Sequence, residues 1–154
     1  MGMTDLYSPI LLDHNANPDY RYTIDSPTHT HDGINPTCGD ELTIQVRLGD
    51  DGKIAEAAFT GHGCAVSQAS ADMMADAVIG LSPENARKLC QLFERMVRGE
   101  VRDESALDEL GDAASLKDIS HMPSRVKCAE LAWRTLDEML ADDADQSAKA
   151  TTTE

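Results

Sequence analysis

The sequence predicts an α+β fold in which a small antiparallel sheet of about three strands packs against several helices. The first observation is a hairpin: residues 41–48 alternate apolar and polar side chains, Gly49 to Gly52 supply turn residues, and residues 54–60 return as a second strand. The second is apolar side chains at helical spacing, in segments 65–79, 83–98 and 123–140. Because the strands precede a run of helices instead of alternating with them, the order is typical of α+β.

The segment before the hairpin is less regular. Residues 5–14 carry apolar side chains at roughly helical spacing, and the stretch 15–18 ends this short helix. Residues 20–35 are polar and rich in turn formers, so we expect at most one or two short extended pieces there. His29 and His31 alternate on one of these pieces, and we interpret them as solvent-facing side chains in preference to metal ligands.

Cap residues set the limits of the later helices. Gly80 ends the first of them, and Ser82 and Pro83 supply the N-cap and first residue of the next. Residues 100–120 are acidic with scattered leucines and predict a further short helix. Pro123 then opens the last helix.

Length and charge limit the classes of function. A chain of 154 residues suits one core, so we assign residues 1–140 to a single domain and residues 141–154, with four acids and one lysine, to a disordered acidic tail. The net charge of −15 repels phosphate backbones and anionic membranes, which argues against nucleic-acid or membrane binding. No apolar run of about 18 residues and no secretory leader pattern occur, so we expect a cytoplasmic protein.

Three of the four cysteines lie where a thiolate is accessible or favoured. Cys38 lies in the turn before the first hairpin strand and Cys64 follows the second strand, so strand pairing brings the two together. Cys64 and Cys128 each begin a helix, Cys128 in the first turn after Ser124, where backbone amides favour the thiolate over the thiol. Cys90 lies on an apolar helical stripe and is expected to be a buried, inert thiol.

A shared metal site is one of two interpretations of these residues. Three thiolates and the Asp40 carboxylate satisfy a tetrahedral zinc ion, which keeps its thiolates deprotonated at neutral pH. Asp40 is a harder ligand than a thiolate, so it should loosen the site and favour ligand exchange. The spacings contain no C-x-x-C pair, and the alternative that small cysteines fill turns and helix ends stays open on the residues alone.

Four segments carry a family resemblance: LLDHNANP, NPTCGDELTIQVRL, FTGHGCAVSQASADMM and MPSRVKCAELAWRTL. They resemble the IscU-like family, and specifically its SufU branch, over roughly residues 6–140. In the scaffold branch a histidine precedes the third cysteine, where this chain has Lys127, and a proline-rich chaperone-docking motif is present that this chain lacks. The region 99–120 resembles the insertion of the SufU branch. The resemblance implies an IscU-like fold and four zinc ligands, Cys38, Asp40, Cys64 and Cys128.

The resemblance also implies a role in SUF-type iron-sulfur cluster assembly. Members of this branch act beside a SufS-type cysteine desulfurase, which uses pyridoxal phosphate to build an enzyme-bound persulfide. In the implied mechanism a desulfurase histidine replaces one thiolate on zinc, which frees Cys38 to accept the persulfide sulfur, while Asp40 keeps the ion bound. The sulfur would then pass to a SufBCD-type scaffold, so the resemblance implies a sulfurtransferase that acts with the desulfurase.

Two other functions would use the same residues. A scaffold protein would assemble a [2Fe-2S] cluster on Cys38, Cys64 and Cys128. A hydrolytic zinc enzyme would need an open water position and a general base, and no H-E-x-x-H or equivalent motif is visible. We interpret His62 as a turn residue and Lys127 as a solvated lysine, over roles in tuning zinc or the thiolates.

Overall fold

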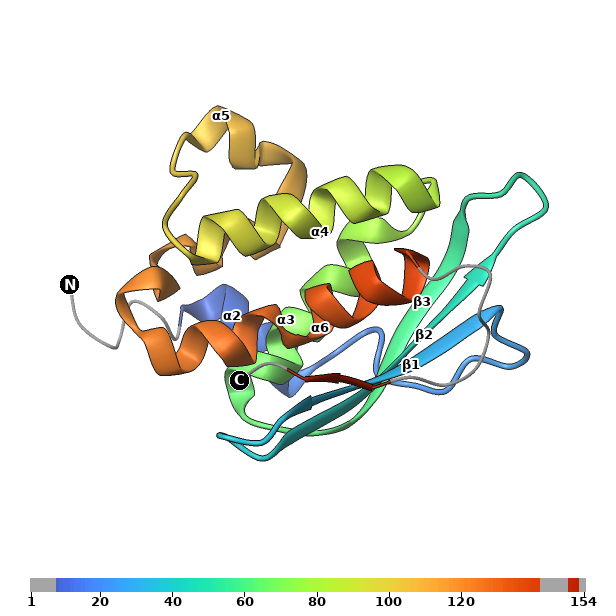
Figure 1. Ribbon diagram of the computed structural model, residues 1–154, viewed down its shortest axis with the longest axis horizontal. Helices are drawn as coiled ribbons and strands as arrows, with labels where there is room; N and C mark the ends of the chain where they lie inside the picture. Colours follow the sequence, from blue (N-terminus) through green and yellow to red (C-terminus); the bar gives the residue numbers. More distant parts are fainter. Residues whose placement is uncertain (1–7, 142–149, 153–154) are drawn as a thin grey trace.

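The computed structural model describes residues 8–141 and 150–152, and it confirms the α+β fold (Figure 1). The predicted hairpin is present and is extended by one further antiparallel strand, so that neighbours along the chain are neighbours in the sheet. A short strand pairs in parallel with the first and completes the order β3-β2-β1-β4. The strands are β1 (His29–Asn35), β2 (Asp40–Leu48), β3 (Ile54–His62) and β4 (Ala150–Thr152).

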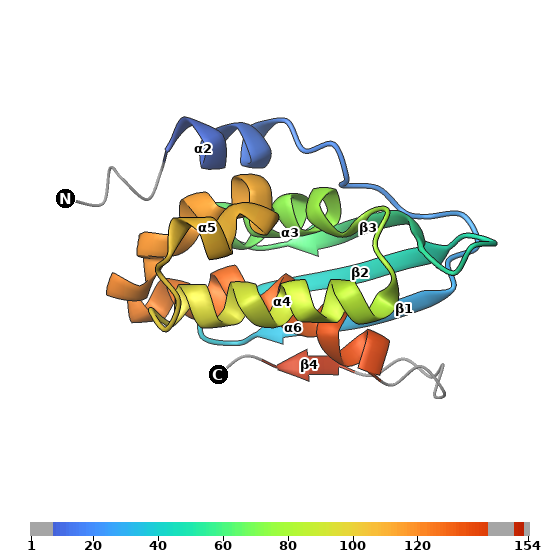
Figure 2. The same ribbon diagram turned by 90° about the horizontal axis from the view of Figure 1, so that it is seen from above.

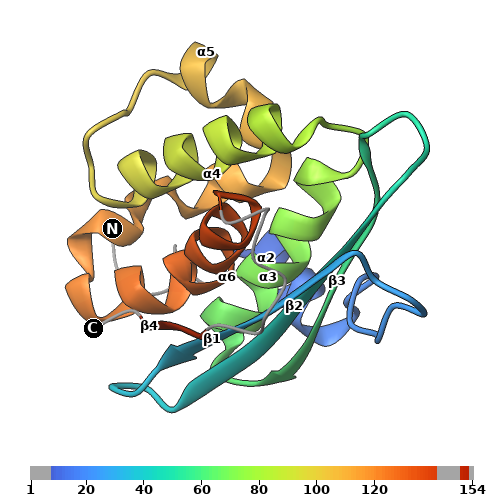
Figure 3. The same cartoon turned by 45° about the vertical axis from the view of Figure 1, so that its right-hand side comes forward.

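The helices cover one face of this sheet. Figure 3 shows α3 and α6 lying between the sheet and α4, while Figure 2 shows α2 beside α3 and β4 beside β1. Within the described residues the helical elements are α2 (Pro9–Ala16), α3 (Ala65–Val78), α4 (Pro83–Val97), α5 (Glu104–Leu107), the 3₁₀ segment η1 (Asp108–His121) and α6 (Pro123–Ala141). None of these helices has the length and apolarity that crossing a bilayer requires.

The predicted helix limits follow from local chemistry. The Ser82 hydroxyl accepts a hydrogen bond from the backbone N–H of Asn85 at 3.2 Å, and Pro83 begins α4, as expected of an N-cap and first helical residue. Gly80 follows α3 with a φ of 93°, a conformation that glycine adopts without strain. These two features turn the chain between α3 and α4.

The core lies between the sheet and its helical layer. Alternate residues of β2 are buried, and they face apolar side chains from α3 and α6. Phe93 of α4 stacks on Trp133 of α6 with ring centroids 4.2 Å apart and an interplanar angle of 5°. The indole N–H of Trp133 donates to Ser70 of α3 at 2.9 Å, so one aromatic side chain joins three helices.

The predicted exposure of two histidines was wrong. His29 and His31 are buried, because the inward row of β1 consists of His29, His31, Gly33 and Asn35, and this row lies under α6. A Cβ at Gly33 would collide with the hydroxyl of Thr135 on α6, which shows how closely the strand and helix approach. Polar residues at alternate positions therefore belong to the buried face of this strand.

Two further stretches differ from the predictions. Residues 100–120, for which we expected one short helix, contain α5 followed by η1, which bends at Gly111 with a φ of 58°. Most of the tail predicted to be disordered lies outside the described residues, but Ala141 ends α6 and residues 150–152 form β4. The predicted helix 5–14 appears as α2, with its first residues also outside the described part.

Candidate metal centre

The turn between β1 and β2 places three polar side chains at one end of the sheet. Asn35 is the last residue of β1 and pairs in register with Asp40, the first residue of β2. Both side chains are fully buried, because each continues the inward row of its strand. Cys38 lies in the intervening turn and is half-buried, and Gly39 closes the turn with a φ of 72°.

A cysteine from α6 completes a compact group of donor atoms. Ligand atoms of Cys38, Asp40 and Cys128 all lie within 4.8 Å of one another. The Sγ atoms of Cys128 and Cys38 are 3.3 Å apart, and Cys128 is buried. The structure thus brings together residues that lie 90 positions apart in the sequence.

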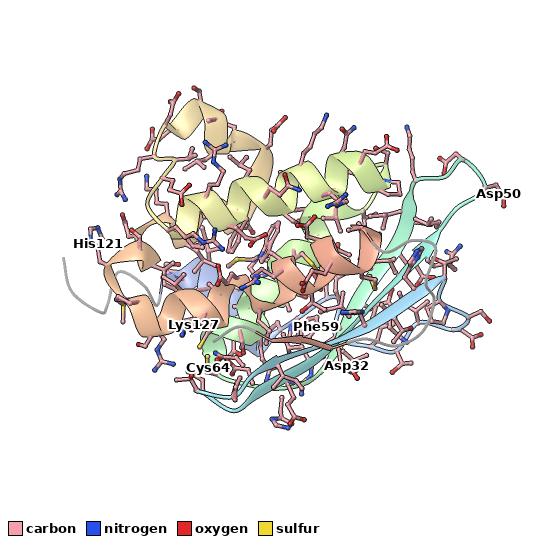
Figure 4. The ribbon with its side chains drawn as sticks, viewed as in Figure 1. Asp32, Asp50, Phe59, Cys64, His121 and Lys127 are labelled. Carbon is pink, nitrogen blue, oxygen red and sulfur yellow. The ribbon has the colours of Figure 1, made fainter. Side chains whose placement is uncertain are left out.

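Cys64 lies beside this group. It is the N-cap residue of α3, and its backbone N–H donates to Asp40 Oδ1 at 2.9 Å. Its thiol is a hydrogen-bond partner of the Cys128 thiol, but its Sγ is not among the donor atoms within 4.8 Å of one another. Figure 4 shows Cys64 at the end of the molecule opposite the Asp50 turn of the hairpin. All four residues predicted from the sequence are therefore found at one end of the fold.

Asp40 is the residue that connects the parts of this site. Its Oδ1 accepts hydrogen bonds from the Cys64 N–H and from the Ser67 hydroxyl, the latter at 3.2 Å, and its Oδ2 accepts from Asn35 Nδ2 at 3.1 Å. Gly63 makes room for this arrangement, because a Cβ there would lie 2.6 Å from Asp40 Oδ1. A buried carboxylate with this many donors is held in one orientation.

The thiols of Cys64 and Cys128 have opposite tendencies to ionise. The hydrogen bond from Cys128 lowers the pKa of Cys64 to about 6, against the opposing effect of burial. The same hydrogen bond, with burial and the nearby Cys38, raises the pKa of Cys128. A thiolate is thus favoured at Cys64, as predicted for a helix start.

The prediction that a helix start also favours the thiolate of Cys128 was wrong. Cys128 is the sixth residue of α6, beyond its first turn, and its Sγ lies 3.7 Å from the Ser124 carbonyl oxygen. A carbonyl oxygen does not stabilise a negative charge, and the amides that would do so lie at the start of the helix.

The donor set fits a zinc ion. Zinc binds cysteine thiolates and carboxylate oxygens in buried sites, and here the sulfurs of Cys38 and Cys128 and the Asp40 carboxylate converge, with Cys64 beside them at the start of α3. In zinc sites, the ligating side chains are usually oriented by hydrogen bonds from residues that do not bind the metal themselves. Asn35 and Ser67 donate such hydrogen bonds to Asp40. The same thiols would also suit an iron-sulfur cluster, which cysteine thiolates hold.

The other residues considered from the sequence do not contribute donor atoms to this group. Cys90 is fully buried, and burial raises the pKa of its thiol, which confirms an inert core cysteine. His62 ends β3 with an exposed side chain, 3.9 Å from Glu41. Lys127 lies at the same end of the molecule as Cys64 (Figure 4).

Sequence reasoning missed Asn35, Ser67 and Gly63 as parts of this site. A signal for Asn35 was present in the alternation of His29, His31, Gly33 and Asn35. If these four residues are taken as the inward-facing row of a strand, Asn35 ends that strand and lies opposite Asp40 across the four-residue turn. Ser67 lies one helical turn after Cys64, where a side chain can reach back to the helix start.

Comparisons with known proteins identify relatives of the whole chain. Residues 6–142 match the family model described as the NifU-like N terminal domain. The chain is 38% identical over 143 residues to the "Iron-sulfur cluster assembly scaffold protein IscU" of Streptococcus pyogenes serotype M1, covering 93% of this chain and 87% of that protein. It is 37% identical over 141 residues to the "Zinc-dependent sulfurtransferase SufU" of Bacillus subtilis (strain 168), covering 91% and 92%.

A solved structure agrees with these relatives. The crystal structure of FiSufU from Fervidobacterium islandicum, a candidate iron-sulfur cluster assembly scaffold protein for the SUF system, superposes with a TM-score of 0.81. The two chains are 33% identical, and the match covers 90% of this chain and 99% of that one. The two chains therefore share one fold over most of their length.

Proposed function

The chain belongs to the family of NifU-like N-terminal domains, in which its relatives are named as an iron-sulfur cluster assembly scaffold, IscU, and as a zinc-dependent sulfurtransferase, SufU, and we propose that it is a zinc-dependent sulfur acceptor. In this role it activates a pyridoxal-phosphate cysteine desulfurase of the SufS type and takes the persulfide sulfur on Cys38. It would thus act as a sulfurtransferase, and Cys38, Asp40, Cys64 and Cys128 would hold the zinc ion.

The observation that carries the proposal is the unequal setting of the cysteines. Cys38 is half-buried on a turn, and within the described residues its one hydrogen-bonded contact is the Cys128 thiol. Cys128 is buried in α6 and also accepts from Asn35 Nδ2 at 3.5 Å, while Cys64 is anchored to Asp40 through its backbone. One sulfur can therefore leave the group without unfolding a helix or a strand.

When bound, zinc would keep the cysteine sulfurs as thiolates at neutral pH. The Cys38 thiolate attacks the outer sulfur of the persulfide on the desulfurase cysteine. A new S–S bond forms to Cys38 Sγ as the old S–S bond breaks, and the electron pair leaves on the desulfurase thiolate. One thiolate and one persulfide exchange places, so the step needs no oxidant or reductant. Asp40 stays fixed by Asn35, Ser67 and the Cys64 N–H during the exchange.

The proposed partners are the desulfurase and, after transfer, a SufBCD-type cluster scaffold. The net charge of −15 supports docking to basic protein surfaces and argues against nucleic acid and membranes as partners. Four cysteines that form no disulfide suit a reducing compartment, and we propose a cytoplasmic location.

A second function uses the same thiols. The relative from Streptococcus pyogenes is named as a scaffold, and Cys38, Cys64 and Cys128 would then hold a [2Fe-2S] cluster. This alternative predicts a coloured protein that contains iron and labile sulfide after anaerobic purification. The sulfur-acceptor proposal predicts a colourless protein that contains zinc.

The test combines metal analysis with cysteine turnover by the cognate desulfurase. We expect one zinc ion per chain, faster turnover when the protein is added, and loss of this stimulation after chelation. Cys38→Ala should abolish the stimulation, and Cys90→Ala should preserve it, because Cys90 is buried away from the site. Normal stimulation by Cys38→Ala would refute the proposal.

A further inference from the structure

The side chain of Asn35 is unusual for its position. It is fully buried, yet its Oδ1 has no hydrogen-bond partner within the described part of the chain. A buried acceptor without a partner destabilises the folded state, so an apolar residue would serve packing alone at least as well. The reason for an amide at this position must therefore lie in the hydrogen bonds that its Nδ2 atom donates.

The other end of the amide contacts two of the candidate metal ligands. Asn35 Nδ2 donates to Asp40 Oδ2 at 3.1 Å and to Cys128 Sγ at 3.5 Å. The reverse orientation of the amide would place its oxygen against the Asp40 carboxylate and the sulfur, both acceptors, so electrostatics fixes the observed orientation. Asn35 thus links β2 to α6 through the site itself.

Ser67 acts on the opposite oxygen of the same carboxylate. Its hydroxyl lies 3.2 Å from Asp40 Oδ1 and 3.0 Å from the Cys64 carbonyl oxygen. Ser67 is also fully buried, and it lies one turn after the N-cap of α3. Asn35 and Ser67 therefore contact the two oxygens of Asp40, while the hydrogen bond of Cys38 in the described part of the chain is to Cys128.

We propose that Asn35, assisted by Ser67, is a positioning residue that fixes Asp40 and Cys128 and leaves Cys38 as the sulfur that can leave the group. This inference rests on the proposed zinc-dependent function and deepens it. Donors that hydrogen-bond to a metal ligand in this way commonly contribute about 10- to 100-fold to metal affinity. The hydrogen bonds hold Asp40 and Cys128 in place and, among the described residues, leave Cys38 without such support. Their placement, and not a difference between the sulfur atoms, would decide which cysteine reacts.

The test measures zinc release from the purified zinc-loaded protein to a chromophoric chelator. Asn35→Ala should release zinc about 10- to 100-fold faster than wild type. Asn35→Leu keeps the branched shape of the side chain but has no donor, so it should release zinc as fast as Asn35→Ala even though it refills the space. Thr135→Val is the matched control, because it removes a different buried hydrogen bond, from Thr135 to the Leu131 carbonyl oxygen, and should leave release unchanged.

Cobalt(II) in place of zinc gives a second readout, since its visible absorption reports the geometry of the ligands. Both Asn35 variants should alter this spectrum, and Thr135→Val should not. If the Asn35 variants do not fold, Ser67→Ala carries the test, with a smaller acceleration expected because the Cys64 N–H still contacts Asp40 Oδ1. Wild-type release by Asn35→Leu would overturn the inference, because packing alone would then explain the residue.

The outcome separates this inference from the proposed function. If the wild type carries sulfur on Cys38 but the Asn35 variants release zinc at the wild-type rate, the inference fails and the proposed function stands. If the variants release zinc faster but the wild type carries no sulfur on Cys38, the proposed function fails and the positioning role stands.

Discussion

Replacing Gly63 by alanine should disturb the candidate metal centre more than the fold. The added Cβ would overlap the Ser67 hydroxyl, which donates to Asp40 Oδ1, and it would lie 2.6 Å from that oxygen itself. Ordinary contact begins at 3.4 Å, so the Asp40 oxygen and the Cβ must separate by a further 3.4 − 2.6 = 0.8 Å. The hydrogen bond from the Cys64 N–H to this oxygen is 2.9 Å long, so movement along its direction would stretch it beyond hydrogen-bonding distance.

The magnitude follows from burial. Asp40 is fully buried, so a carboxylate oxygen that loses a donor is not compensated by water, at a cost of about 1–3 kcal/mol. Because Asp40 is also a candidate ligand, its displacement should weaken zinc binding by about 10- to 100-fold. Urea unfolding measures the first effect, and competition with a chelator measures the second.

Gly80→Ala is the control for the loss of a glycine. Gly80 has a φ of 93°, so alanine is strained there, but no atom lies within 4 Å of the added Cβ and the site is not involved. This variant should lose about 1 kcal/mol of stability and keep wild-type zinc affinity. The reasoning is refuted if Gly63→Ala binds zinc as tightly as Gly80→Ala does.

Three further predictions concern the rest of the molecule. Burial lowers the pKa of His14, but hydrogen bonds to Asp112 and Asp72 outweigh it and raise the pKa, so the charged form stabilises α2. The stability lost in His14→Gln, measured by urea unfolding, should therefore be largest below pH 6.5 and shrink as the pH rises through the folded pKa; a pH-independent loss would contradict this. Trp133→Phe removes the donor to Ser70 and should cost about 2 kcal/mol or more in the same assay, and an unchanged midpoint would contradict it. If the charge of −15 guides docking, affinity for the desulfurase should fall as salt rises, and a salt-independent affinity would reject this.

The sequence was sufficient for features that local chemistry determines. The β2–β3 hairpin follows from side-chain alternation and a glycine-containing turn, and the start of α4 follows from Ser82 and Pro83. The position of Cys64 at a strand-to-helix junction follows from the end of the hairpin pattern before it and the start of the apolar helical spacing after it. The prediction that Cys38 and Cys64 lie at the same end of the hairpin needed only the pairing of its strands.

Features that depend on contacts between distant segments could not be predicted in this way. β1 has few apolar side chains, and its polar inward row is buried only because α6 packs on it. The pKa shift of Cys128 depends on Cys64 and Cys38, which lie far away in sequence. The contacts of Asn35 with Asp40 and Cys128 likewise appear only when the strand register and the position of α6 are known together.

The most direct test of the central claim is to locate the transferred sulfur. The zinc-loaded protein would be mixed anaerobically with the cognate desulfurase and cysteine, its thiols blocked, and its peptides analysed by mass spectrometry. We predict one additional sulfur atom on the peptide that contains Cys38, and none on the peptides that contain Cys64, Cys90 or Cys128. Sulfur found on another cysteine, or no persulfide together with a stable iron-sulfur cluster, would contradict the account.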